Sequence, residues 1–283
     1  MDMQALLERQ SFIELDARGR AKKLVDEGTF NELLGPFERV SSPWLKRQGI
    51  VTQADDGMVV AKGTIDGQPA VVLAIDGGFQ GGSMGEVSAA KIAGSLDLAA
   101  DDNRRGIPTR AVILFETGGV RLQEANLGLA GIAEIHAGIV DLRRYQPVIG
   151  ITAGPIGCYG GMSIAAGLCS YLIGTREARL GLNGPAVIEQ EAGIAEFDSR
   201  DRAMIWSFTG CEQRHRTGLL DVYTADDADA IRTAIIDCFR AGRPDACRSE
   251  RVVGFLQRLS EVDPRVQATP EQAAAIFSRG FAS

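Results

Sequence analysis

Residues 111–124 read AVILFETGGVRLQE and residues 147–162 read PVIGITAGPIGCYGGM. In each stretch an apolar run that is typical of a buried strand leads into a glycine pair, and a helical pattern follows. We expect Gly118-Gly119 and Gly160-Gly161 to mark turns where a strand ends and a helix begins. Because parallel strands end at the same edge of a sheet, both turns are expected at the ligand-binding edge of an α/β fold.

The pattern on either side of these stretches predicts βαβ-like alternation. Asp66-Gly67 between two β-rich runs is a strong hairpin signal. The expected elements are a hairpin of Met58–Ile65 and Pro69–Ile75, a glycine-rich loop over 77–85, a helix to about Ala100, a strand over Ala111–Phe115, a helix over Leu122–Arg144, a strand over Pro147–Thr152, a helix from near Gly160 and a strand over Tyr171–Gly174.

Helical extensions are expected at both ends of this alternating core. Polar helices and a loop are expected in the first 50 residues, with Ser11 as a plausible helix N-cap. We therefore predict an N-terminal helical extension over 1–50, a core domain over 51–245 and a C-terminal helical extension over 246–283. Later helices are expected near Ser199–Thr209, Asp226–Ala241, Ser249–Glu261 and Pro270–Ser278.

Composition and charge exclude several classes of protein. The net charge is −7 and the basic residues are scattered, which argues against nucleic acid as a partner. No apolar stretch is long enough to span a membrane, and the opening residues do not resemble a secretion signal. The five cysteines form no Cys-x-x-Cys pair, which argues against a disulfide framework and against a zinc ribbon. We expect a cytoplasmic protein without a metal site.

The glycine turns could serve as paired hydrogen-bond donors. Glycines at the start of a helix leave backbone N–H groups unpaired and let a ligand oxygen approach closely. Such donors suit a reaction in which negative charge develops on a thioester carbonyl oxygen. The candidate donors are the backbone N–H groups of Gly118, Gly119, Gly160 and Gly161. The alternative is that these glycines only form tight turns, as is common in α/β proteins. Gly77 and Gly82 have P-loop spacing, but Ser83-Met84 stands where a P-loop needs lysine.

Several other residues have competing interpretations. Arg121 and Glu124 could form an intrahelical ion pair, or Arg121 could contact the ligand. His136 lies on an apolar helix face and suits packing better than general-base catalysis, and His215 between two arginines could meet a phosphate or lie on a solvated face. Cys158 lacks an identifiable base, so burial is favoured over nucleophilic catalysis.

Five ordered sequence blocks resemble a known family over roughly Phe79 to Tyr223. The blocks are Gly82-Ser83-Met84-Gly85, Gly118-Gly119-Val120-Arg121-Leu122-Gln123-Glu124, Gly160-Gly161-Met162-Ser163, Gly184-Pro185-Ala186-Val187-Ile188-Glu189-Gln190 and Gly218-Leu219-Leu220-Asp221. They resemble the carboxyltransferase branch of the crotonase-like superfamily, which includes the acetyl-CoA carboxylase β subunit. No four-cysteine zinc module precedes residue 50, and the variants at 116–121 and 154–159 look more like the β subunit of malonate decarboxylase.

This resemblance implies a crotonase-like ββα superhelix and a lyase subunit. The implied reaction releases CO₂ from a malonyl thioester on an acyl-carrier protein through an oxyanion-hole-stabilised enolate and leaves an acetyl thioester. The implied partners are a γ subunit, the acyl-carrier protein and an acyl-carrier-protein transferase. The thioester would belong to a CoA-like prosthetic group, with neither zinc nor biotin. Tyr159, Met162 and Arg121 are candidate contacts to the thioester or its pantetheine arm. The alternatives are carboxyl transfer between malonyl thioester and biotin, and a non-catalytic scaffold that docks the carrier.

Overall fold

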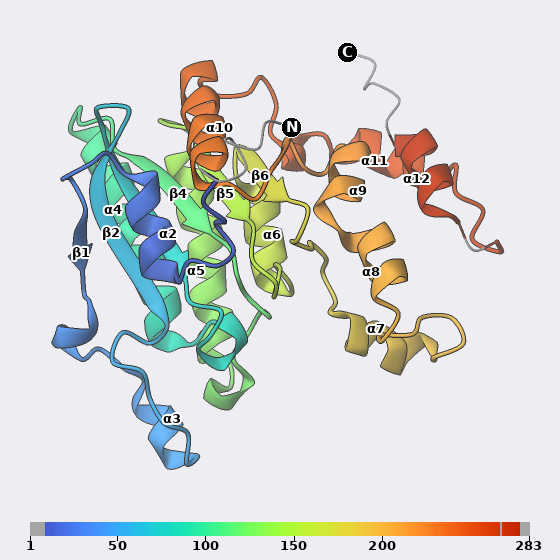
Figure 1. The fold of residues 1–283 in the computed structure, drawn as a ribbon, viewed down its shortest axis with the longest axis horizontal. Coiled ribbons are helices and arrows are strands. Elements are labelled where there is room, and N and C mark those ends of the chain that lie inside the picture. The colour runs from blue at the N-terminus through green and yellow to red at the C-terminus, as the bar shows by residue number, and fades with distance from the viewer. Residues whose placement is uncertain (1–8, 267, 278–283) are drawn as a thin grey trace.

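The computed structural model describes residues 9–266 and 268–277 and contains a seven-stranded sheet (Figure 1). Its strands follow one another in sequence order: β1 (Asn31–Leu33), β2 (Met58–Ile65), β3 (Gln68–Ile75), β4 (Arg110–Leu114), β5 (Val148–Thr152), β6 (Tyr171–Thr175) and β7 (Val222–Thr224). The first three strands pair antiparallel, and β3 to β7 pair parallel. The predicted α/β class is therefore confirmed.

The β2–β3 hairpin forms at the predicted Asp66-Gly67 turn. Both turn residues have positive φ, 52° at Asp66 and 72° at Gly67, as a two-residue hairpin turn requires. Ile65 pairs with Gln68 across the turn, so β3 begins one residue before the predicted start at Pro69. The turn chemistry fixes the register of the whole hairpin.

Helices cover both faces of the sheet, and each face has its own apolar core. Helices α4 (Glu86–Arg104), α5 (Leu127–Leu142) and α6 (Gly161–Leu168) cover one face. Helices α2 (Ala17–Leu24) and α10 (Ala228–Ala241) cover the other and lie in front of the sheet in Figure 1. Along β4, Ala111 and Ile113 point into the first core, while Val112 and Leu114 point into the second. This alternation explains why β4 reads as a continuous apolar run.

The N-terminal residues pack against the same sheet. Asp16 caps α2 by accepting a hydrogen bond from Gly19 N–H (2.6 Å). The expectation that Ser11 is a helix cap is wrong, because its hydroxyl donates instead to Asp226 (2.5 Å). Strand β1 extends the sheet edge, and the short helix α3 (Pro43–Arg47) follows it. The division at residues 50 and 245 stays a prediction.

The later helices gather beside the sheet (Figure 1). They are α7 (Pro185–Ala192), α8 (Arg202–Thr209), α9 (Cys211–Arg216), α11 (Val252–Leu259) and α12 (Pro270–Phe277), with short 3-10 helices at Pro36–Glu38, Gln80–Gly82, Leu122–Glu124 and Arg248–Glu250 elsewhere in the chain. Three of the predicted late helices, near 199–209, 226–241 and 249–261, are present with later starts. The fourth is present over 270–277, and its predicted last residue, 278, lies outside the described residues. Every helix in the described ranges is too short or too polar to cross a lipid bilayer.

Candidate active site

Both glycine turns lie beyond the carboxyl ends of their strands, as the sequence predicts. Past the end of β4, Thr117 pairs with Cys158, which in turn pairs with Leu180. Thr117 N–H donates to Gly157 O (2.8 Å), and Tyr159 N–H donates to Thr117 O (3.0 Å). These bridges continue the parallel pairing into the loops, so the two turns are held side by side.

The two turns touch at Gly119 and Gly160. A Cβ added at Gly119 would lie 3.3 Å from Gly160 Cα, and one added at Gly160 would lie 3.1 Å from Gly119 Cα. Both residues have positive φ, 109° and 61°, a conformation that other residues seldom adopt. The sequence needs glycine at these two positions for both space and backbone geometry.

Three of the four candidate donors already have acceptors in the protein. Gly118 N–H donates to Gly81 O (2.9 Å), and Gly160 N–H donates to Leu182 O (2.8 Å). Gly119 N–H donates to the hydroxyl of Thr117 (3.0 Å). In this geometry these three N–H groups hold the turns in place.

The N–H groups of Val120 and Gly161 have no acceptor among the described residues. Gly161 is the first residue of α6, where a helix leaves its N–H without an internal partner. Val120 follows Gly119, and its nitrogen lies 3.9 Å from a Cβ built on Gly160. The contact between the turns therefore has one free donor on each side. Sequence reasoning named Gly161 but did not name Val120.

The loop before α4 supports the first turn. Met84 N–H donates to Gly119 O (2.8 Å), and Arg121 N–H donates back to Met84 O (2.9 Å). The Arg121 guanidinium donates to Ser83 O (2.8 Å) and lies over the Phe79 ring, 5.1 Å from its centroid. Two of the five sequence blocks are therefore in direct contact.

Arg121 is buried in a cluster of charged side chains. Its side chain is 1% exposed and contacts both carboxylate oxygens of Asp56 at 2.8 and 3.0 Å. Glu124, the ion-pair partner expected from sequence, is 3.4 Å away. A Cβ on Gly85 would overlap the Glu124 carboxylate. These contacts hold the first turn in place, and the role of Arg121 as a thioester contact stays a prediction.

Helix α5 supports the second turn. His136 Nε2 donates to Gly161 O (2.9 Å), and Ile132 packs beneath Gly161. This contact agrees with the prediction that His136 has a structural role and is not a general base. Met162 is fully buried in the core. Its candidate role as a pantetheine contact stays a prediction.

Cys158 and Tyr159 are buried beside the second turn. Burial raises the pKa of the Cys158 thiol well above its ordinary value, so the reactive thiolate is scarce at neutral pH. Burial likewise raises the pKa of Tyr159, although Arg179 acts in the opposite direction. Tyr159 is 6% exposed and lies under Arg179, with 5.8 Å between the guanidinium carbon and the ring centroid. His215, a candidate phosphate contact, has its Nδ1 3.2 Å from Leu220 O and stacks on Tyr223.

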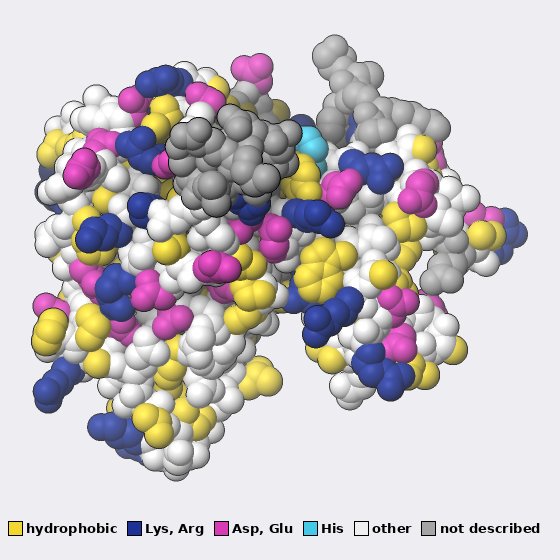
Figure 2. Space-filling view, viewed as in Figure 1, with side chains coloured by type: hydrophobic (Ala, Val, Ile, Leu, Met, Phe, Trp, Pro, Cys, Tyr) yellow, Lys and Arg dark blue, Asp and Glu magenta, His cyan; other side chains and the backbone are white. Residues whose placement is uncertain are grey.

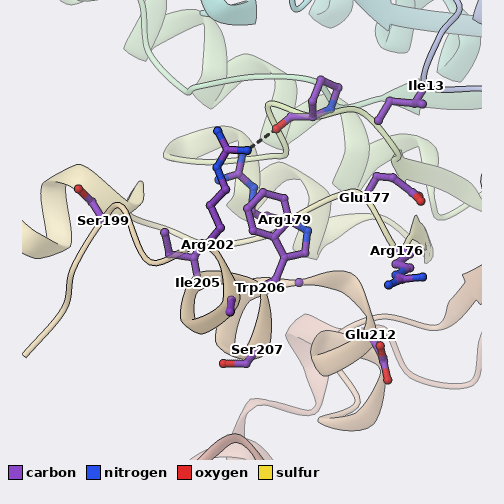
Figure 3. A pocket seen from close by; sticks show the side chains of 13 residues that line it. Ile13, Arg176, Glu177, Arg179, Ser199, Arg202, Ile205, Trp206, Ser207 and Glu212 are labelled. Carbon is purple, nitrogen blue, oxygen red and sulfur yellow. Dashed lines mark hydrogen bonds between the residues drawn. The ribbon is translucent and has the colours of Figure 1, made fainter.

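A cavity of about 900 Å³ lies between the sheet and the helices α8 and α9 (Figures 2 and 3). Arg179 separates it from Tyr159: its guanidinium lies over the Trp206 ring at 4.3 Å and donates to Pro155 O (2.6 Å). None of the four candidate glycines lines this cavity.

The glycine turns instead face an open surface. Gly118 is exposed, and Gly160 and Gly161 are half-buried. Large apolar side chains nearby in the chain or in contact are exposed, at Leu122, Leu129, Ile164 and Leu182. Exposed apolar residues around a polar site are typical of a surface that a partner covers. Among the described residues, no group of three or more His, Cys, Asp or Glu side chains is arranged to hold a metal ion.

Comparisons with known proteins agree with this architecture. The carboxyl transferase domain matches residues 14–241. The malonyl-S-ACP:biotin-protein carboxyltransferase of Malonomonas rubra is 38% identical over 269 residues, which cover 90% of this chain and 83% of that protein. A chain in the crystal structure of a Pseudomonas malonate decarboxylase hetero-tetramer in complex with malonate is 63% identical, with a TM-score of 0.95, covering 98% of this chain and 100% of that one.

A second crystal structure gives a related match. A chain of a Pseudomonas malonate decarboxylase hetero-dimer is 58% identical, with a TM-score of 0.77, covering 92% of this chain and all of that one. The crotonase-like carboxyltransferase fold expected from the five sequence blocks is confirmed.

Proposed function

The chain belongs to the carboxyl transferase domain family, and from this premise we propose that it is the β subunit of a malonate decarboxylase. The identity of 63% over almost the whole chain supports this reading over more distant activities of the fold. The proposed catalytic role rests on two free backbone N–H groups, those of Val120 and Gly161. They lie where the two turns touch.

In the proposed reaction the bond between the malonyl carboxylate and the α-carbon breaks. The bonding electrons move into an enolate of the thioester, CO₂ leaves, and a proton added at carbon gives an acetyl thioester. The negative charge of the enolate is on the former carbonyl oxygen, which would accept hydrogen bonds from Val120 and Gly161. Donors fixed in advance need no reorganisation during the reaction, and one is worth about 2.7–4 kcal/mol. The positive end of the α6 helix dipole would also stabilise this negative charge.

We further propose that a γ subunit covers the exposed apolar side chains around the turns. The substrate would be a malonyl thioester of a CoA-like prosthetic group on an acyl-carrier protein, which an acyl-carrier-protein transferase loads. This reading places the complex in the cytoplasm, in keeping with five buried cysteines that form no disulfide. Biotin is not part of the proposed reaction.

The second candidate is carboxyl transfer between malonyl thioester and biotin. The 38% identity to a biotin-protein carboxyltransferase favours it, but the lower identity makes it the weaker reading. Both reactions would use the same enolate, so the turns cannot separate them. The third candidate is a non-catalytic scaffold that docks the carrier protein and lends only surface to its partner.

The deciding experiment combines this chain with its candidate γ partner and measures CO₂ release from malonyl carrier protein or malonyl-CoA, with and without avidin. The proposal predicts CO₂ release that needs both chains and is unaffected by avidin. Loss of CO₂ release on adding avidin would support biotin-dependent carboxyl transfer instead. A Gly119→Pro or Gly161→Pro complex with wild-type turnover would support the scaffold.

A further inference from the structure

Glu116 connects the two glycine turns through its side chain. It follows β4 and lies two residues before Gly118, and its side chain is 5% exposed. Its carboxylate crosses to the loop before the second turn, where Oε1 accepts a hydrogen bond from Ile156 N–H (3.0 Å). A Cβ at Gly154 would overlap this carboxylate, so the loop is shaped around it.

Arg20 fixes the other oxygen of this carboxylate. Its guanidinium forms an ion pair with Glu116 Oε2, and its side chain is 9% exposed. Arg20 is itself fixed by hydrogen bonds to Phe12 O (2.9 Å) and Ile13 O (2.8 Å). Because both charges are buried and each oxygen has a partner, the Glu116 carboxylate has a single orientation.

We propose that Glu116 is a positioning residue for decarboxylation, which sets the distance between the two free N–H donors. This inference rests on the proposed function. Glu116 ties the 154–157 loop to the strand end that leads into the first turn, and the Thr117–Cys158 bridge carries this restraint on toward Gly160. A displacement of about 1 Å between reacting groups can cost about a hundredfold in rate. Glu116 contacts neither turn's free N–H, so it acts only through the loop.

Two variants separate the effect of losing the hydrogen bond from Ile156 N–H from the effect of losing the ion pair with Arg20. Glu116→Ala removes both interactions. The double variant Glu116→Gln with Arg20→Met removes the charges but keeps a side-chain oxygen that can accept from Ile156 N–H. We expect Glu116→Ala to lower kcat about a hundredfold with KM changed less than about threefold. The double variant should keep kcat within about fivefold of wild type, because the loop keeps its restraint.

Asp221→Ala is the matched control, because it also removes both an ion pair and an acceptor of a backbone N–H. Asp221 also forms an ion pair with an arginine, Arg248, and also accepts from a backbone N–H, that of Leu172 (2.7 Å), but at the opposite end of the sheet. Loss of the Asp221 carboxylate should lower the melting temperature of the complex. It should not lower kcat when kcat is measured well below that temperature. An equal fall in kcat for Asp221→Ala and Glu116→Ala would overturn the inference, since lost stability would explain both.

Hydrogen exchange measured on residues 154–161 of the intact complex gives a readout that does not need turnover. Glu116→Ala should speed exchange in this segment at least about tenfold, while Asp221→Ala should leave it unchanged. Unchanged exchange in Glu116→Ala, or a double variant as slow in turnover as Glu116→Ala, would contradict a positioning role. If the wild-type complex releases no CO₂, the proposed function fails, and the exchange result still decides whether Glu116 restrains the loop.

Discussion

Replacing Gly161 by proline removes one of the two free N–H groups with little change to the helix. Gly161 is the first residue of α6, the position at which proline is best tolerated in a helix. Gly160 before it has φ of 61° and ψ of −148°, which lies outside the right-handed helical region that a following proline disfavours. The substitution therefore tests the donor rather than the fold.

Gly161→Ala is the control for the added side chain. A Cβ at this position would lie 2.9 Å from Ile132 Cγ2, so both variants press on the same neighbour. Such crowding costs about 1–3 kcal/mol of stability, and the melting temperatures of the two variants should fall by similar amounts. Only the proline variant loses the N–H group.

The expected difference follows from the value of one oxyanion donor. Loss of a single donor lowers kcat about 10²–10³-fold, so Gly161→Pro should be slower than Gly161→Ala by that factor, with KM little changed. The assay is steady-state CO₂ release from malonyl carrier protein by the complex with the γ partner. Equal kcat for the two variants at equal stability would refute the role of the Gly161 N–H.

Three further predictions concern two buried groups and one half-buried carboxylate. Arg121→Met leaves Asp56 as an uncompensated buried carboxylate, so the free energy of unfolding measured by denaturant titration should fall by about 3–5 kcal/mol; a loss below about 1 kcal/mol would contradict the buried ion pair. Cys158 should resist iodoacetamide at pH 8 in the folded complex, because burial raises its pKa, and rapid alkylation seen by mass spectrometry would show that the thiol is accessible. Burial alone would raise the pKa of Asp26, but hydrogen bonds from Thr64 and from the N–H groups of Gly67 and Asp66 lower it below 3.8. Its contribution to stability should therefore be present above about pH 4 and disappear as pH falls through the lower folded pKa, so unfolding curves of wild type and Asp26→Asn should converge toward acid pH; a difference that persists unchanged at pH 2 would argue against this linkage.

The sequence predicts the frame of the site well because its signals are local. The Asp66-Gly67 turn and the apolar runs that end at Leu114 and Thr152 depend on neighbours within a few residues. Parallel pairing then brings the two glycine turns to one edge, so their proximity follows from the fold class alone.

The donor on the first turn could not be chosen from sequence. The N–H groups of Gly118 and Gly119 are engaged by Gly81 O and by the Thr117 hydroxyl, and the first of these contacts depends on how a distant loop packs. This leaves the next residue, Val120, with the free N–H. Glycine identity indicates where a turn bends, whereas hydrogen bonding decides which N–H remains free.

The sequence pattern also could not predict which residues pair with the buried charged side chains. Arg121 pairs with Asp56, which lies 65 residues earlier, while the spacing pointed only to Glu124. Arg20 reaches Glu116 across 96 residues and connects the N-terminal helix to the site. Such contacts between distant segments leave no periodic signal, and they explain why residues in the first 50 pack as part of the sheet layer.

A crystal structure of this chain with its γ partner and a bound, non-reactive malonyl thioester analogue would show whether Val120 and Gly161 form the oxyanion site. If both N–H groups stabilise the enolate, the thioester carbonyl oxygen should lie within about 2.7–3.1 Å of both Val120 N and Gly161 N. An analogue bound with that oxygen held by other groups, and with the contact between the two glycine turns empty, would contradict this role of the two N–H groups.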